Sequence, residues 1–342
     1  MEEGILKDIV KDLKDSFKDK GKFVKLSNED YESVEISEDN FHGINESGSD
    51  SRIVFIDGGN AEILKAANFS LQFARIYYTI YKDNKRVENK KYEFYVLIKS
   101  FDKEGKIFYK TKLFGDKIID DFEFDSFDKS IIQGNNRADI SFIGNVLRRF
   151  AELKIASKLL NSLDEKDIVI FDGSLETKYN GEKEILEEIY DKAVEKGVVI
   201  SALSKTCELF TDKGSSVLSV LDEIQPQKEW YYHPIAKMGS MKHDILFVKL
   251  NEKSKYIFRF DILGSQLDKI SGVLDLLKLN SKDPVFFGYP YGLIEADRFA
   301  RVSNQELELL KTKFMIKAGE DWKIINSFLK TKDSHNILDN IR

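Results

Sequence analysis

The chain has 342 residues, of which 42% are hydrophobic and 33% charged, so it is long enough for one elaborated domain or for two. Its single cysteine, Cys207, excludes an internal disulfide framework and the usual zinc sites built from several cysteines. The formal net charge of −6 argues against a protein that coats polyanions through a broadly basic surface. No apolar run suits a signal peptide or a membrane span, so we expect a cytoplasmic protein.

The first part of the chain predicts one helix and then a series of strands. Apolar residues spaced as one face of a helix cover residues 4–19, and the polar segment 38–51 predicts a loop. Residues 53–56 are all β-branched or aromatic, which predicts a strand buried on both faces. Three partly alternating segments predict antiparallel strands at 69–81, 92–98 and 107–113, with turns at 83–84 and 103–105.

The rest of the chain alternates helices and strands. Residues 116–137 are acidic and then polar, which predicts an exposed insertion. Helices are predicted at 140–159, 185–196, from 205 to 210, near 266–279 and over 293–314. Strands are predicted at 168–171, 198–201, 245–250, 256–260 and 284–287.

This order of elements predicts an α/β fold in which a mixed β-sheet is flanked by helices. We expect an N-terminal helical and loop extension over residues 1–50 and a main domain over 51–315, with the insertion near 116–137 inside it. Residues 316–342 are expected to form a C-terminal helical tail.

Two of the buried strands end in the same way, and this is the most informative feature of the sequence. Residues 53–56 lead into Asp57-Gly58, and residues 168–171 lead into Asp172-Gly173. Open α/β folds place ligands at the carboxyl edge of the sheet, so two carboxylates presented there predict a divalent-metal site. Asp-Gly is also common turn chemistry, and the motif alone leaves that interpretation open.

A third acid lies on the helix that precedes the second of these strands. Glu152 shares a helix face with Arg148, at the border of the apolar stripe. One interpretation is a surface ion pair between these two side chains. The other is a third carboxylate aimed at the metal site, because a helix before the strand can pack on the sheet near its edge.

Residues 286–298, with the sequence FFGYPYGLIEADR, predict a strand, a turn and the start of a helix. Acids in the first turn of a helix are favoured by the helix dipole, so Glu295 and Asp297 have a purely structural explanation. The turn nevertheless follows an apolar strand, as the other acids do.

Together these segments resemble the NurA nucleases, which process DNA ends in archaea and some bacteria. The resemblance rests on Asp57, on Glu152 before the FDGSL segment, and on the closing segment YPYGLIEADRFAR, which is its most specific part. It covers residues 53–302 and extends to Leu203-Ser204-Lys205 and to residues 230–234. It implies a fold similar to RNase H, with insertions.

The resemblance also implies roles for individual residues. Asp57, Glu152 and Asp172 correspond to metal ligands, and Asp297 to a fourth, C-terminal site residue. Tyr289 corresponds to a site tyrosine that contacts the scissile phosphate or orients Asp297.

Weaker candidates for contact with DNA phosphates are Lys205, His233 and Arg298. A lone histidine in an aromatic run is more often a packed side chain than a catalyst. Two departures from the family pattern are Asp297, where some members have histidine, and Gly59, where serine is commoner.

The ligand chemistry predicts Mn²⁺ or Mg²⁺, and the resemblance implies Mn²⁺ as the preferred ion. Carboxylate oxygens suit both ions, whereas zinc usually recruits histidine or cysteine, and the four histidines and one cysteine here have no ligand spacing. Phosphodiester hydrolysis needs an activated water molecule and stabilisation of the leaving oxygen. A pair of bound cations meets both needs.

The resemblance therefore implies a Mn²⁺-dependent DNA nuclease with 5′-to-3′ exonuclease and single-strand endonuclease activity, in DNA end resection and double-strand break repair. It implies a homodimer that works with a HerA-type hexameric ATPase and translocase on single-stranded DNA and double-stranded ends. The sequence has no GxxxxGK[ST] phosphate loop, which assigns ATP hydrolysis to the partner.

Two alternatives remain open at this point. One is a non-catalytic subunit of the same fold that docks on a DNA translocase, and DNA binding without cutting, with or without metal, would favour it. The other is an RNase H-fold ATPase, which ATP binding by the isolated chain would favour.

Overall fold

The computed structural model describes residues 2–16, 20–26, 30–45, 50–239 and 242–329. Internal contacts divide the chain into two units. Unit 1 comprises residues 1–51, 170–175 and 199–291, and unit 2 comprises residues 52–169, 176–198 and 292–342. The predicted division into residues 1–50, 51–315 and 316–342 does not follow the boundaries of these two units, and it stays a prediction. Among the described residues, no helix combines the length and apolar character needed to cross a membrane.

The strands confirm the predicted mixed sheet flanked by helices. Within the described part of the chain, the largest sheet has 11 strands in the order β3-β12-β14-β15-β10-β9-β4-β5-β6-β7-β8. Strand β9 (Ile168–Asp172) contributes its first two residues to unit 2 and its last three to unit 1. The chain passes from β9 through α3 (Glu182–Lys196) to β10 (Val199–Ser204), as predicted, and Gly197 ends α3 in a left-handed conformation.

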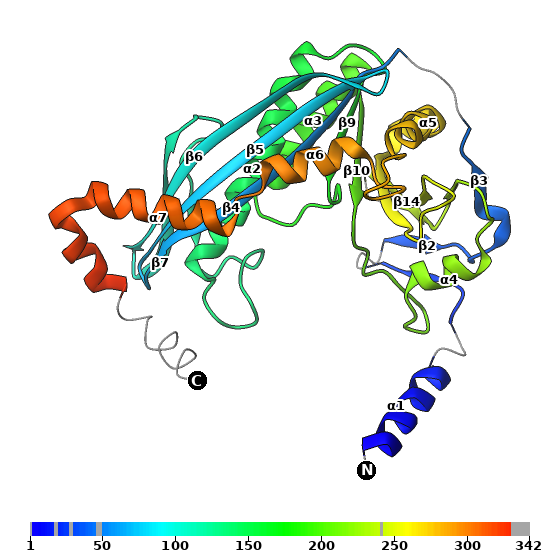
Figure 1. Cartoon of the computed structure of the whole chain (residues 1–342), viewed down its shortest axis with the longest axis horizontal. Helices are drawn as coiled ribbons and strands as arrows, with labels where there is room; N and C mark the ends of the chain where they lie inside the picture. The colour runs from blue at the N-terminus through cyan, green and yellow to red at the C-terminus, as the bar shows by residue number, and fades with distance from the viewer. Residues whose placement is uncertain (1, 17–19, 27–29, 46–49, 240–241, 330–342) are drawn as a thin grey trace. The chain divides into compact units, whose positions relative to one another are not determined.

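Unit 2 is built around long antiparallel strands (Figure 1). They are β4 (Ile53–Lys65), β5 (Phe69–Lys82), β6 (Lys85–Lys103) and β7 (Lys106–Gly115), each paired with the next, and the short β8 (Glu123–Asp125) pairs with β7. The predicted turns are confirmed, with positive φ at Asp83 and Asn84 and again at Glu104 and Gly105. The strands are longer than their apolar segments because pairing continues into polar residues such as those of β6.

Helices cover both faces of β5, which is why almost all of this strand is buried. Gln72 faces α2 (Ile143–Leu159) and donates a hydrogen bond to the Ser141 carbonyl at 2.6 Å, in the short helix η2 (Ile140–Phe142) just before it. On the other face, Tyr77 stacks on Phe299 of α6 (Tyr291–Ala300) with ring centroids 5.1 Å apart. Side chains alternate along a strand, so these two contacts come from opposite faces.

The predicted helix over 293–314 is two helices. α6 ends at Ala300, and α7 (Asn304–Ala318) begins after Ser303, whose hydroxyl accepts a hydrogen bond from the Glu306 amide at 3.1 Å. A serine N-cap of this kind starts a new helix. The tail continues through η5 (Gly319–Asp321) into a helical segment at 322–329, and residues 330–342 lie outside the described part.

The segment 116–137 is not the wholly exposed insertion that was predicted. It adds β8 to the sheet and buries Ile118, Ile119, Phe124 and Ile131. Its acidic residues alternate with these apolar ones, so one side of the segment packs on unit 2.

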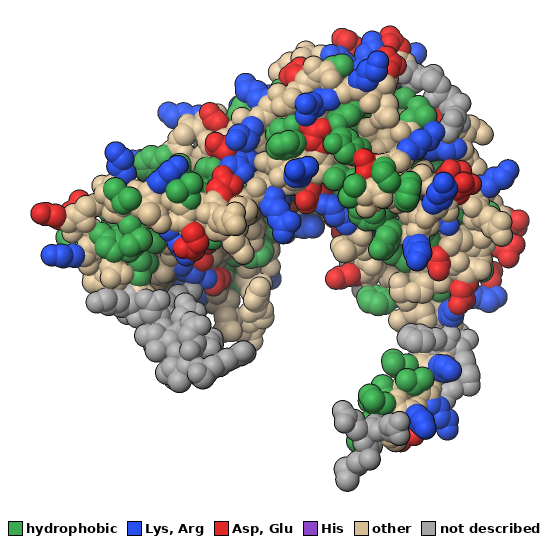
Figure 2. All heavy atoms as spheres, in the orientation of Figure 1, with side chains coloured by type: hydrophobic (Ala, Val, Ile, Leu, Met, Phe, Trp, Pro, Cys, Tyr) green, Lys and Arg blue, Asp and Glu red, His purple; other side chains and the backbone are tan. Residues whose placement is uncertain are grey.

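The outer part of unit 2 carries an apolar surface over β6, β7 and α7 (Figure 2). Leu71 and Phe73 lie in a cluster with Leu310 and Phe314 of α7. A cavity of about 620 Å³ beside this cluster is lined mainly by apolar side chains, including Tyr95 and Phe114.

Unit 1 contains β3 (Phe41–Gly43), β12 (Trp230–Tyr232), β14 (His243–Lys249), β15 (Phe258–Leu263) and β10, which are antiparallel to one another in that order. Two small sheets pair β1 (Val24–Lys25) with β11 (Phe210–Thr211), and β2 (Tyr31–Ser33) with β13 (Ala236–Met238). This unit also contains the helices α4 (Val217–Ile224) and α5 (Ile270–Asn280), the latter preceded by η4 (Gly264–Lys269).

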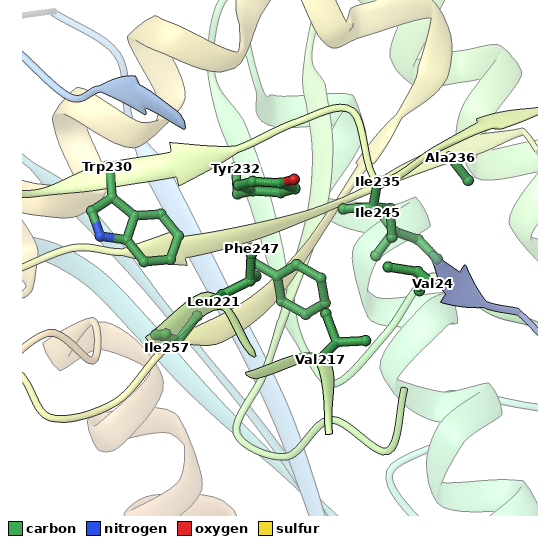
Figure 3. Packing of buried hydrophobic residues seen from close by; sticks show 10 residues of the cluster. All are labelled: Val24, Val217, Leu221, Trp230, Tyr232, Ile235, Ala236, Ile245, Phe247 and Ile257. Atoms are coloured by element: carbon green, nitrogen blue, oxygen red, sulfur yellow. The ribbon is translucent and has the colours of Figure 1, made fainter. Parts of the chain in front are cut away.

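The core of unit 1 gathers residues far apart in the sequence (Figure 3). Trp230, Tyr232 and Phe247 are almost completely buried beside Val24 and Leu221. β3 adds Phe41 to this group, edge-on to Trp230 at 4.7 Å, so part of the predicted loop at 38–51 is strand. The short helix η1 (Glu38–Asn40) precedes it, and residues 46–49 lie outside the described part.

Two further local predictions in unit 1 are wrong. Residues 205–209 form no helix, because Cys207 and Leu209 instead pack from an irregular segment against the core. Residues 284–287 form turns rather than a strand, and Phe286 is partly buried by aromatic packing on Tyr289.

The N-terminal helix α1 (Glu2–Ser16) confirms the prediction over its described residues, and residues 17–19 lie outside them. Its apolar face, with Ile5, Ile9 and Leu13, is about half exposed.

Candidate active site

Asp57 lies within a strand rather than at its end. β4 continues through Gly58 and Gly59 to Lys65, and Asp57 is directly opposite Tyr77 of β5. The expectation that Asp57 ends the strand is therefore wrong, because these glycines keep the extended conformation and remain paired. Burial does change here: residues 53–56 are buried, whereas Asp57 is half-buried and its Oδ1 accepts a hydrogen bond from the Gly58 amide at 2.7 Å.

Glu152 of α2 lies directly over the residue that follows Asp57. A Cβ on Gly58 would come within 2.6 Å of Glu152 Oε1 and 2.9 Å of Arg148 Cγ, so glycine permits this close approach. Arg148 Nη1 donates to Glu152 Oε1 at 2.8 Å and to the Gly58 carbonyl at 2.7 Å. The Arg148–Glu152 pair was one of the two interpretations from sequence, but it is not a surface pair, because Glu152 is only 4% exposed.

The helix that carries Asp297 is held firmly against β4 and β5. A Cβ on Gly292 would lie 2.0 Å from the Phe55 ring, and one on Gly59 would lie 2.4 Å from the Ala300 carbonyl oxygen. Backbone and ring therefore touch directly at both ends of α6. Asp297 is half-buried on this helix, and Arg298 next to it is exposed.

Glu295 is a buried structural carboxylate on the same helix. It is 4% exposed and accepts hydrogen bonds from Tyr77 at 2.7 Å, from Arg86 at 2.9 Å and from Tyr81. Burial alone would raise the pKa of Glu295, but the hydrogen bonds from the two tyrosines and Arg86 outweigh it and lower the pKa. These partners could not be predicted from the sequence, because they lie more than 200 positions away along the chain.

Asp172, in unit 1, ends its strand as predicted. Lys205 Nζ contacts Asp172 Oδ2 at 2.6 Å, and the Tyr289 hydroxyl lies 3.3 Å from Oδ1. The Gly173 amide bonds the Leu203 carbonyl at 3.0 Å, and Gly173 has φ +112°, a conformation that favours glycine. The chain can therefore turn away directly after the acid.

Tyr289 has a fixed position because its ring is fully buried. It stacks on Phe286 and meets Phe258 edge-on, with both centroids 5.2 Å away. The Lys205 ammonium lies 5.5 Å from the centre of the Tyr289 ring. Two predicted site residues, Tyr289 and Lys205, thus meet at Asp172.

The loop after Asp172 is anchored by a buried ion pair that the sequence did not reveal. Asp261 of β15 is 1% exposed, accepts from Arg259 Nε at 2.7 Å and accepts from the Leu175 amide at 3.0 Å. His233, a weak candidate from sequence, has its Nε2 3.7 Å from Asp244 Oδ1. Its backbone carbonyl bonds His42 Nε2 at 2.9 Å, which points to a packing role.

Among the described residues, one group of acids has the spacing of a metal site. Asp57, Asp172 and Asp297 each offer one carboxylate oxygen, and these oxygens all lie within 4.8 Å of one another. All three side chains are half-buried. Hard oxygen donors at this spacing fit Mg²⁺ or Mn²⁺. The group unites three of the four predicted ligands, and Glu152 is outside it.

Comparisons with known proteins agree with the sequence resemblance. Residues 51–302 match the NurA domain family. The NurA nuclease from Sulfolobus solfataricus shares the fold with a TM-score of 0.54 and 15% identity, over 93% of this chain and 95% of that one. The catalytic domain of human endonuclease V has a TM-score of 0.40 and 8% identity, over 75% of this chain and 88% of that one. No curated protein sequence matches the chain.

Proposed function

The chain belongs to the NurA family, and we propose that it is a DNA nuclease that hydrolyses phosphodiester bonds with divalent metal ions. The observation that carries this proposal is the group of three carboxylates, Asp57, Asp172 and Asp297, with oxygens within 4.8 Å of one another. A binding module has no need for three acids at one place. Their mutual repulsion is costly unless cations are present.

Asp57, Asp172 and Asp297 are metal ligands in this proposal. Glu152 is the fourth ligand, and its hydrogen bond from Arg148 holds it beside Gly58. Bound cations would activate a water molecule and stabilise the leaving oxygen. The buried ring of Tyr289 fixes its hydroxyl beside Asp172, where it can orient that carboxylate. α6 holds Asp297 in place through its tight packing on β4.

The finer assignments come from the family. We propose Mn²⁺ as the preferred ion, with Mg²⁺ as the alternative and about two ions per site. We further propose 5′-to-3′ exonuclease and single-strand endonuclease activity in end resection and double-strand break repair, by a homodimer that works with a HerA-type translocase. Arg298, which is exposed, remains a proposed phosphate contact.

The test is degradation of end-labelled linear DNA with Mn²⁺, Mg²⁺ or EDTA by wild type, Asp57→Ala and Asp172→Ala. Asp191→Ala, an exposed acid on α3, is the matched control. We expect cutting that requires metal, is lost in both site variants and is kept in the control. The fate of the label at each end gives the polarity.

Two outcomes would contradict the proposal. Normal cutting by both site variants would place the active centre elsewhere. No cutting by wild type, even with a HerA-type ATPase added, together with DNA binding that ignores metal, would support a non-catalytic docking subunit. Adding labelled ATP to the isolated chain tests the ATPase alternative in the same series.

A further inference from the structure

In the metal-free protein, the Lys205 ammonium pairs with a carboxylate that a metal ion would need as a ligand. Its ammonium nitrogen lies 2.6 Å from Asp172 Oδ2, and the Tyr289 hydroxyl lies 3.3 Å from Oδ1. Both oxygens of Asp172 therefore have a partner in the metal-free protein. An ammonium and a divalent cation repel each other and compete for the same oxygen.

The position and length of the Lys205 side chain allow its ammonium group to change partners. Lys205 stands directly after β10, at the start of the irregular segment 205–209, and its side chain is 37% exposed. A four-carbon stem lets the ammonium swing without moving the backbone. The Tyr289 ring, 5.5 Å from the ammonium, keeps part of the interaction when the carboxylate is given up.

We propose that Lys205 is an exchangeable counter-ion of Asp172, which a divalent cation displaces and which then binds a phosphate of the DNA. This inference rests on the proposed function and adds an order of events to it. Without metal, the lysine neutralises Asp172. With metal bound, the released ammonium supplies a positive charge beside the site.

The first test is Mn²⁺ binding to the DNA-free protein, measured by calorimetry and by the EPR signal of free Mn²⁺. Lys205→Met removes the competing charge and keeps the length of the side chain, so we expect tighter Mn²⁺ binding, by about fivefold or more. Lys205→Arg keeps the charge and should bind Mn²⁺ like wild type. Lys237→Met, which breaks the exposed pair with Glu32 at 3.3 Å, is the control and should change nothing.

The second test is binding of a short single-stranded DNA in EDTA and in Ca²⁺. In EDTA, where Lys205 is engaged with Asp172, Lys205→Met should bind DNA no more weakly than wild type. In Ca²⁺ the Lys205→Met variant should bind DNA more weakly than wild type. The slope of log K against log salt should become less negative by about 0.7, as expected for the loss of one phosphate contact on a single strand.

The results separate this inference from the proposed function. Equal Mn²⁺ affinity in wild type and Lys205→Met would overturn the exchange while leaving the metal nuclease intact. Weaker Mn²⁺ binding in that variant would make Lys205 a support of the site rather than a competitor. Absence of Mn²⁺ binding in every variant would overturn both the metal site and the exchange.

Discussion

Two acids of the proposed site, Glu152 and Asp172, are each paired with a neighbour of opposite charge. Arg148 reaches both Glu152 and the backbone of Gly58, and Lys205 reaches Asp172. The acids could be located from sequence because they follow apolar strands or share a helix face with an arginine. Lys205 could be named only weakly, because its contact depends on where β10 and β9 place their ends.

Arg148→Met tests whether Glu152 belongs to the metal site. Glu152 is 4% exposed and keeps a longer ion pair with Arg149 at 3.7 Å. Loss of the closer partner, Arg148, should lower the free energy of unfolding by about 1–3 kcal/mol without metal. Saturating Mn²⁺ should restore part of this loss, since the cation supplies a new counter-charge and binds only the folded protein. Thermal unfolding with and without Mn²⁺ measures both effects.

The control for this experiment is Arg137→Met, at an exposed position whose guanidinium lies 5.6 Å from the Phe127 ring centre. It should leave the Mn²⁺-induced rise in melting temperature unchanged. If Mn²⁺ raises the melting temperature of Arg148→Met and of wild type by the same amount, Glu152 is a structural acid and not a ligand.

At the scale of elements, helix α6 depends on small residues where it crosses β4. Gly292→Ala would place a Cβ 2.0 Å from the buried Phe55 ring, so the helix must shift. We expect a loss of about 1–3 kcal/mol in stability, together with slower DNA cutting because Asp297 moves with the helix. Gly272→Ala in α5, where nothing lies within 4 Å of the new Cβ, should be neutral or stabilising by up to about 1 kcal/mol. Urea unfolding of both variants decides the matter, and equal stabilities would contradict the packing argument.

Glu295 fixes the same helix through charge. Its pKa is lowered in the folded protein, so its stabilising effect is present at neutral pH and is lost as the pH falls through that lowered pKa. Glu295→Gln should therefore cost about 2 kcal/mol at pH 7, and the difference from wild type should shrink below the ordinary glutamate pKa of about 4.5. Urea titrations across pH 3 to 7, about the range over which glutamates titrate, measure this.

Glu308→Gln is a suitable comparison, because that side chain is 70% exposed and pairs with Lys311 at 3.1 Å. It should change stability by less than about 0.5 kcal/mol at every pH. A stability difference for Glu295→Gln that stays constant down to pH 3 would show that its carboxylate is not the stabilising form.

At the scale of the whole molecule, the sequence predicted the fold class and most strands, because buried strands have a strong apolar signal. It failed at one local helix break and where packing or strand pairing decides the structure. The predicted helix over 293–314 is instead two helices, with Ser303 as the N-cap of the second. Cys207 and Leu209 pack on the core from an irregular segment, and Phe286 packs on Tyr289 from a turn. Strand β4 continues beyond Asp57 because it pairs with β5, and the two glycines after Asp57 give no indication of this pairing in the sequence.

The overall charge of the chain leads to a last prediction. With a net charge of −6 and an acidic site, DNA should bind weakly in EDTA and more tightly once a divalent cation neutralises the carboxylates. Asp57→Asn removes one negative charge at the site, so it should strengthen DNA binding in EDTA by about fivefold, a change of about 1 kcal/mol. In Ca²⁺ the same variant should bind DNA more weakly than wild type, because a metal ligand is lost. Fluorescence anisotropy with a labelled single strand measures all four conditions. A change of the same sign with and without metal would mean that Asp57 acts on DNA through its own charge and not through a bound cation.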